Sequence, residues 1–192
     1  MAKIMKFIAG AACILTLLSA LIYYKFHSGI IMTFAITFGT IAYHFCMRLL
    51  IGLIYNTVMN NKADYTKKWF QPARYEEKLY RLLRVKKWKG KMPTYNSSFF
   101  DSATHTLDEI AQAMCQAELV HETIIVFSFL PIIASVWVGE LPVFIITSVL
   151  AALFDSLFVI MQRYNRPRIV RLIERQAKER SEERRVGKEC RS

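Results

Sequence analysis

The sequence has few cysteines, and their spacing argues against the two kinds of site that cysteines most often build. Four occur in 192 residues, at Cys13, Cys46, Cys115 and Cys190, and none belongs to a C-x-x-C pair. Structural zinc sites and disulfide frameworks depend on closely spaced or paired cysteines. The sequence therefore predicts neither.

Glutamate–histidine pairs at helical spacing are just as scarce. Only Glu118 and His121 form an E-x-x-H pair in the apolar part of the chain, whereas di-iron carboxylate proteins use two such pairs with further glutamates. A single metal held by His44, Glu118 and His121 stays open as an alternative. Our main interpretation has no metal ligands and no tightly bound cofactor.

No recognisable nucleic-acid-binding module accompanies the net charge of +11. The basic residues instead gather in three places: Lys3 and Lys6, eleven residues between 62 and 91, and eleven more from 163 onward. The turn at Gly139 and Glu140 carries none. Because cytoplasmic loops hold the Lys/Arg excess of membrane proteins, both termini and the central loop are predicted to be cytoplasmic, with no nucleic-acid partner.

Long apolar runs explain the hydrophobic content of 54%. Four stretches approach the length of about 20 residues that crosses a bilayer, namely 7–24, 30–50, 119–138 and 141–161. The third is long enough only if its helix begins before His121. The first lacks a clear small-x-small cleavage site and is read as a retained anchor. We expect an all-α integral membrane protein of about four transmembrane helices, with residues 1–178 as one membrane domain.

Residues 61–105 are predicted to form a basic cytoplasmic segment at the membrane interface. Cations alternate there with Trp and Tyr, which suits the lipid headgroup zone, although a solvated connector is the alternative. The stretch RYEEKLYRLLRV fits a short amphipathic helix. Residues 179–192, which end in SEERRVGKECRS, resemble vector-derived sequence and are expected to be disordered or of vector origin.

A capping box is predicted where the third span approaches the membrane. Thr106 precedes Glu109 by three residues, the spacing at which each side chain bonds the other's backbone N–H. The helix that starts there is expected to run into the third span, with a kink at Pro131.

Ionisable residues of three predicted spans fall toward their cytoplasmic ends. Such residues are costly in a bilayer and usually face a protein interior or a wet cavity. Taken singly, Arg48 could reach the headgroups and Asp155 could merely neutralise it. Together they predict a site at the cytoplasmic rim, built from His44, Arg48, Glu118, His121, Glu122, Asp155 and Gln162.

This residue set suits group transfer to an alcohol. A neutral histidine can take a proton from a hydroxyl while a carboxylate orients the ring, and arginines can hold phosphate or a developing oxyanion. We predict His121 as base and Glu118 as its orienting carboxylate. Arg163, Arg166 and Arg168 would bind a phosphate-bearing cytosolic donor such as acyl-CoA, and the acceptor would enter from the bilayer.

Three motifs occur along the chain: VKKWKGKMP (Val85–Pro93), AELVH (Ala117–His121) and QRYNRPR (Gln162–Arg168). They resemble motifs of the bacterial glycosyl-diaponeurosporenoate acyltransferases, which acylate a glycosylated carotenoid acid. The resemblance spans roughly residues 69 to 172. It implies a multi-pass acyltransferase of the bacterial cytoplasmic membrane that acts on a sugar hydroxyl of a lipid. By motif position it adds Trp88, Lys89 and Asn165 to the candidate substrate-binding residues.

The chain departs from that family at two positions. Gln116 stands where the family has arginine, and Glu122 follows the histidine where an aromatic is usual. A different hypothesis is a non-enzymatic membrane scaffold or lipid-binding partner, in which the rim charges serve only topology and helix pairing.

Overall fold

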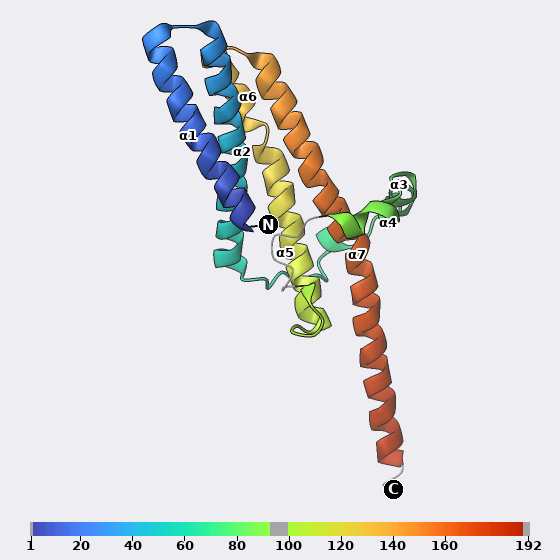
Figure 1. Cartoon of the computed structure of the whole chain (residues 1–192). Coiled ribbons are helices and arrows are strands. Elements are labelled where there is room, and N and C mark those ends of the chain that lie inside the picture. The colour runs from blue at the N-terminus through green and yellow to red at the C-terminus, as the bar shows by residue number, and fades with distance from the viewer. Residues whose placement is uncertain (1, 93–99, 190–192) are drawn as a thin grey trace. The chain divides into compact units, whose positions relative to one another are not determined.

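The computed structural model describes residues 2–92 and 100–189, and within those ranges it is helical, with turns and no strand. Figure 1 shows the elements in order. They are α1 (Ala2–Phe26), α2 (Gly29–Met59), η1 (Lys68–Phe70), α3 (Glu76–Leu82), α4 (Val85–Trp88), η2 (Lys89–Lys91), α5 (Leu107–Phe127), α6 (Leu130–Val138) and α7 (Leu141–Glu189). The predicted all-α class is confirmed.

Four helical stretches are long and apolar enough to cross a membrane, as predicted. They cover Ala2–Phe26, Gly29–Met59, Leu107–Val138 and Leu141–Arg185. Large apolar side chains point outward along them, and Trp137, for example, is 78% exposed. Because so much exposed apolar surface is rare on soluble monomers, these faces suit lipid.

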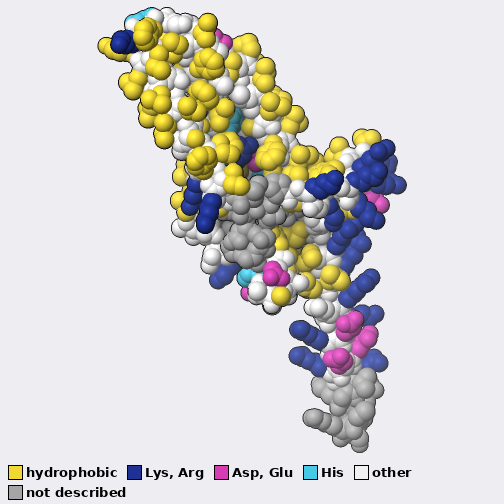
Figure 2. Space-filling view, viewed as in Figure 1, with side chains coloured by type: hydrophobic (Ala, Val, Ile, Leu, Met, Phe, Trp, Pro, Cys, Tyr) yellow, Lys and Arg dark blue, Asp and Glu magenta, His cyan; other side chains and the backbone are white. Residues whose placement is uncertain are grey.

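The contacts of the chain group into two compact units. Among the described residues, the first unit holds 2–60 and 119–159, and the second holds 61–92, 100–118 and 160–189. The division predicted from hydropathy, one membrane domain over 1–178 with 61–105 as an interfacial segment, stays a prediction. In Figure 2 apolar side chains cover the helices of the first unit, whereas Lys and Arg gather over α3 and α4 and along the C-terminal part of α7.

In the first unit, α1 packs along α2, and α2 also runs beside α7. Thr33 and Glu140 bond at 3.2 Å near the start of these two helices, and Arg48 pairs with Asp155 further along. Both contacts join residues 107 positions apart. A constant offset means that α2 and α7 run parallel and in register between the two contacts. An apolar core of Met47, Ile51 and Ile124 fills the space beside them.

The predicted kink at Pro131 appears as a break between α5 and α6. Proline has no N–H, so the carbonyl of Phe127 loses the helical donor it would have four residues on. The Tyr43 hydroxyl supplies the missing bond at 2.9 Å. The chain resumes as α6 with Pro131 in its first turn, where a proline costs nothing.

In the second unit the predicted capping box is present. The Thr106 N–H donates to Glu109 at 2.9 Å, and the Glu109 N–H donates to the Thr106 hydroxyl at 3.3 Å. Gln116 stands at the position where arginine was noted for the family. Its Oε1 accepts a hydrogen bond of 2.7 Å from the N–H of Asn61, just after α2. It therefore fastens the start of the loop.

The predicted amphipathic helix is α3, which is shorter than the pattern suggested. It ends before Arg84, whose left-handed backbone (φ 49°) redirects the chain into α4. At the other end α7 continues to Glu189, so residues 179–189, which we expected to be disordered or of vector origin, are helical. That region is rich in Glu, Arg and Lys, which favour helix, and Glu182 within it pairs with the preceding Lys178 at i,i+4 spacing.

Candidate active site

The polar centre of the first unit is a histidine held by a buried carboxylate. Nδ1 of His121 on α5 lies 2.8 Å from Oδ1 of Asp155 on α7. Oδ2 of that carboxylate pairs with Arg48 on α2, whose Nε donates at 3.1 Å. The Asp155 side chain is 1% exposed, whereas that of His121 is 22% exposed. The histidine ring is thus the more accessible member of the pair.

Two contacts fix the His121 ring. The Phe158 ring stacks on it, with centroids 4.5 Å apart and 7° between the planes. A carboxylate beside Nδ1 favours the tautomer with the proton on Nδ1, which leaves the lone pair on Nε2. The carboxylate that orients His121 is therefore Asp155, and not Glu118 as we predicted. The three-residue spacing of Glu118 and His121 suggested a partner on α5 itself, and it carries no information about Asp155 on α7.

Two other buried polar groups of the first unit lack a hydrogen-bond partner within the described part of the chain. They are the His44 side chain, at both ring nitrogens, and the Ser148 hydroxyl. His44 lies one turn before Arg48, and its carbonyl accepts from Arg48 Nη1 at 3.3 Å. His44 thus touches the Arg48–Asp155 pair through its backbone, while its imidazole stays available to a polar group.

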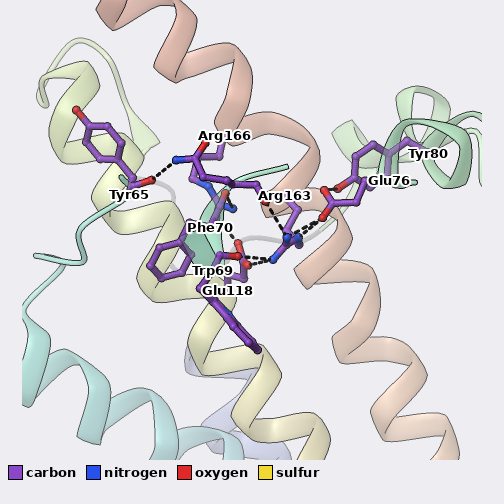
Figure 3. A network of polar contacts seen from close by, with 9 residues as sticks. Tyr65, Trp69, Phe70, Glu76, Tyr80, Glu118, Arg163 and Arg166 are labelled. Atoms are coloured by element: carbon purple, nitrogen blue, oxygen red, sulfur yellow. Dashed lines mark hydrogen bonds and ion pairs between the residues drawn. The ribbon is translucent and has the colours of Figure 1, made fainter. Parts of the chain in front are cut away.

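The polar centre of the second unit is Glu118, which is completely buried and binds two arginines (Figure 3). One carboxylate oxygen accepts 2.7 Å from Nη1 of Arg163, and the other pairs with Arg166. Arg166 is 2% exposed and also donates to the carbonyl of Phe70. Its guanidinium lies 5.0 Å from the centre of the Phe70 ring.

Arg163 connects this pair to α3. Its Nε and Nη2 donate to one oxygen of Glu76 at 2.9 and 2.6 Å, and the Tyr80 hydroxyl donates to the other. Arg163 also donates to the carbonyls of Trp69 and Gln71. Burial raises the pKa of Glu76, but the bonds from Arg163 and Tyr80 outweigh burial and hold the pKa below its ordinary value. Glu76 is therefore an anion at neutral pH.

The charges of this network balance, and we call it the closed network. Arg163 and Arg166 face Glu76 and Glu118, so two positive charges meet two negative ones. We predicted both arginines as phosphate ligands. Their contacts instead tie together η1, α3, α5 and α7, a task that suits the planar guanidinium with its several donors.

A second group of cations surrounds Tyr164 on α7. The Lys89 ammonium lies 4.9 Å from the ring centroid and donates 2.6 Å to Oδ1 of Asn165. The Arg168 guanidinium lies 4.4 Å from the same centroid, and its Nη2 donates 2.6 Å to the Tyr164 hydroxyl. Tyr80 braces the ring edge-on, with centroids 5.4 Å apart. Two residues of the predicted substrate set, Lys89 and Arg168, therefore contact one aromatic side chain, and a third, Asn165, is bonded to Lys89.

The remaining candidates lie elsewhere. The Trp88 indole donates 3.0 Å to the carbonyl of Leu83, Gln162 is buried and Glu122 is half-buried. Pro93, the last residue of the VKKWKGKMP motif, lies outside the described residues. As for the alternative metal site, no cluster of three or more His, Cys, Asp or Glu suited to a metal occurs among residues the structure describes.

Sequence reasoning missed Glu76, Tyr80 and Phe158. Glu76 and Tyr80 stand four apart on α3, an i,i+4 spacing that does mark one helix face. We used only the apolar residues of that stretch and so overlooked the pair. Phe158 carries no signal, because a phenylalanine in an apolar span looks like any other.

Residues 66–175 match the family model of the glycosyl-4,4'-diaponeurosporenoate acyltransferases. This match covers 110 of the 192 residues and includes η1, α3, α4, η2, α5, α6 and the first part of α7. No curated protein and no solved structure gives a match to the chain.

Proposed function

Because the chain belongs to the glycosyl-4,4'-diaponeurosporenoate acyltransferase family, an acyltransferase family of carotenoid biosynthesis, we propose that it acylates a hydroxyl of a membrane glycolipid. The acyl donor in this proposal is a cytosolic thioester such as acyl-CoA, and a glycosylated carotenoid acid is one candidate acceptor. The observation that carries the chemistry is the His121–Asp155–Arg48 arrangement.

In the proposed step Nε2 of His121 removes the proton of the acceptor hydroxyl. The hydroxyl oxygen attacks the carbonyl carbon of the thioester, a C–O bond forms and the C–S bond breaks. The proton on Nε2 then passes to the leaving thiolate, which departs as the free thiol. Asp155 stabilises the imidazolium, and the hydrogen bond from Arg48 Nε holds the Asp155 carboxylate in position.

The membrane setting follows from the same features. An apolar acceptor reaches helices with exposed apolar faces from within the bilayer, and the donor arrives from the aqueous side. We propose the bacterial cytoplasmic membrane, with both termini and the 61–92 loop on the cytoplasmic side. The distribution of Lys and Arg supports this orientation.

The test compares the lipids of a deletion strain that carries the wild-type gene, His121→Ala or Asp155→Asn. We expect one glycolipid to gain the mass of an acyl chain only with the wild-type gene. Loss of the base or of its orienting carboxylate should lower turnover at least about a hundredfold. Mass spectrometry of extracted lipids and initial rates on purified protein provide the measurements.

His105→Ala is the matched control, because His105 belongs to the second unit and has no part in the proposed step. It should leave acylation unchanged at equal protein level. If no lipid differs between the deletion and wild-type strains, the proposed reaction is wrong. If His121→Ala keeps full activity, the assignment of the base is wrong.

A further inference from the structure

The cations around Tyr164 differ from the arginines of the closed network in their charge balance. Within the described residues neither Lys89 nor Arg168 forms an ion pair with a carboxylate. Burial, with the charges of Arg168 and Lys86 beside it, lowers the pKa of Lys89. Like charges held close together, without an anion of the protein between them, leave a positive potential that an anionic ligand would relieve.

The donors of this group are only partly used. Asn165 takes one of the three ammonium hydrogens of Lys89, and the Tyr164 hydroxyl takes one donor of Arg168. Since the Tyr164 oxygen is the acceptor in that bond, its own hydrogen is left to donate. Lys89 and Tyr164 are half-buried and Arg168 is exposed, so solvent reaches the group.

The group is also held in place. Tyr80 packs edge-on against Tyr164 and is itself bonded to Glu76, which Arg163 holds. Cations that contact the same aromatic ring gain cation–π energy and lose freedom. A site with fixed donors binds an anion better than mobile surface lysines do.

We propose that Lys89, Tyr164 and Arg168 form a phosphate-binding site, and that the phosphate it takes is that of the acyl donor. This inference rests on the proposed function for the identity of the donor. It moves the role of phosphate ligand away from Arg163 and Arg166, whose donors are used within the protein. Charge-assisted bonds from an ammonium and a guanidinium are those that phosphate oxygens prefer.

The probe is 3′,5′-ADP, which carries two of the phosphate groups of coenzyme A and no acyl chain. Its binding to the full chain in neutral-lipid nanodiscs is measured by isothermal titration calorimetry. We expect Lys89→Gln/Arg168→Gln to weaken binding at least about tenfold, because two charge-assisted contacts are lost. Lys91→Gln/Arg171→Gln removes the same charge from exposed neighbours and should weaken it less than about twofold. An equal loss in both pairs would mean diffuse attraction and would overturn the proposal.

A second arm separates the two sources of phosphate. The same variants are compared for binding to vesicles with and without phosphatidylglycerol. If Lys89→Gln/Arg168→Gln weakens only vesicle binding, the ligand is a lipid headgroup, and the assignment to the donor is wrong. Because binding of 3′,5′-ADP needs no turnover, it can fail while His121→Ala still abolishes acylation, and the reverse. Failure of the phosphate site can therefore be distinguished from failure of the proposed reaction.

Discussion

Glu118 and His121 show that spacing along a helix does not decide the role of a residue. They lie three residues apart on α5, yet Glu118 gives both oxygens to arginines and His121 bonds Asp155. Both oxygens of Glu118 are thus engaged by guanidinium groups, whereas the imidazole is bonded to a different carboxylate. The roles follow from the charges that other elements place opposite each side chain.

The stability of the second unit should depend on Glu118. Arg166 is 2% exposed, so Glu118→Gln leaves a buried guanidinium without its anion. Breaking a buried ion pair from one side costs about 3 to 5 kcal/mol. We expect a loss of that size in the free energy of unfolding, measured by denaturation in detergent micelles.

Glu174→Gln, which removes an exposed carboxylate of α7, is the control and should change stability by less than about 0.5 kcal/mol. Glu118→Gln/Arg166→Gln should recover part of the loss, since no unpaired charge then remains at that position. Equal effects of Glu118→Gln and Glu174→Gln would show that the buried pair contributes nothing.

At the scale of elements, the helix break between α5 and α6 depends on two residues 88 positions apart, Pro131 and Tyr43. Pro131 removes the donor for the Phe127 carbonyl, and the Tyr43 hydroxyl replaces it. A carbonyl without a donor is costly where no water reaches it. The Phe127 carbonyl therefore needs the Tyr43 hydroxyl as its donor only while residue 131 is a proline.

This reasoning predicts a coupling between two substitutions. Tyr43→Phe alone should destabilise the protein by about 1 kcal/mol, because the Phe127 carbonyl loses its donor. In a Pro131→Ala background the restored N–H can serve that carbonyl, so Tyr43→Phe should cost much less. Unfolding free energies of the wild type, both single variants and the double variant measure the coupling. Additive effects would contradict the compensation.

The sequence was informative about elements that depend on neighbouring residues. The four long helices follow from hydropathy, the start of α5 from Thr106 and Glu109, and its end from Pro131. Contacts between distant segments could not be read in this way. The Arg163–Glu76 bond joins residues 87 positions apart, and no periodicity of α3 identifies a partner on α7.

The same limit applies to the candidate site. Ionisable residues in apolar spans marked His121, Asp155 and Arg48, because such residues need a polar partner. Which carboxylate faces the histidine depends on the rotation and register of α7 against α2 and α5. The packing of apolar side chains, such as Ile124 against Met47, sets this rotation and register. Many different apolar sequences can pack in the same way, so the sequence does not identify the register.

At the scale of the whole molecule, the distribution of charge implies one orientation in the membrane. Lys and Arg crowd the 62–91 loop and the chain beyond residue 162, whereas the α1–α2 and α6–α7 turns carry almost none. Positive residues stay on the cytoplasmic side, where anionic lipids also attract them. The two short turns should therefore face outward.

Labelling of single cysteines tests this orientation in whole cells. In a background without Cys13, Cys46, Cys115 and Cys190, the variants Ser28→Cys and Leu141→Cys place a thiol beside each short turn. We expect a membrane-impermeant maleimide to label both in intact cells. Lys87→Cys and Glu179→Cys should react only after permeabilisation, because a cytoplasmic thiol is shielded by the bilayer. The reverse pattern would put the basic segments outside and, with them, Lys89 and Arg168, where no cytosolic thioester could reach them.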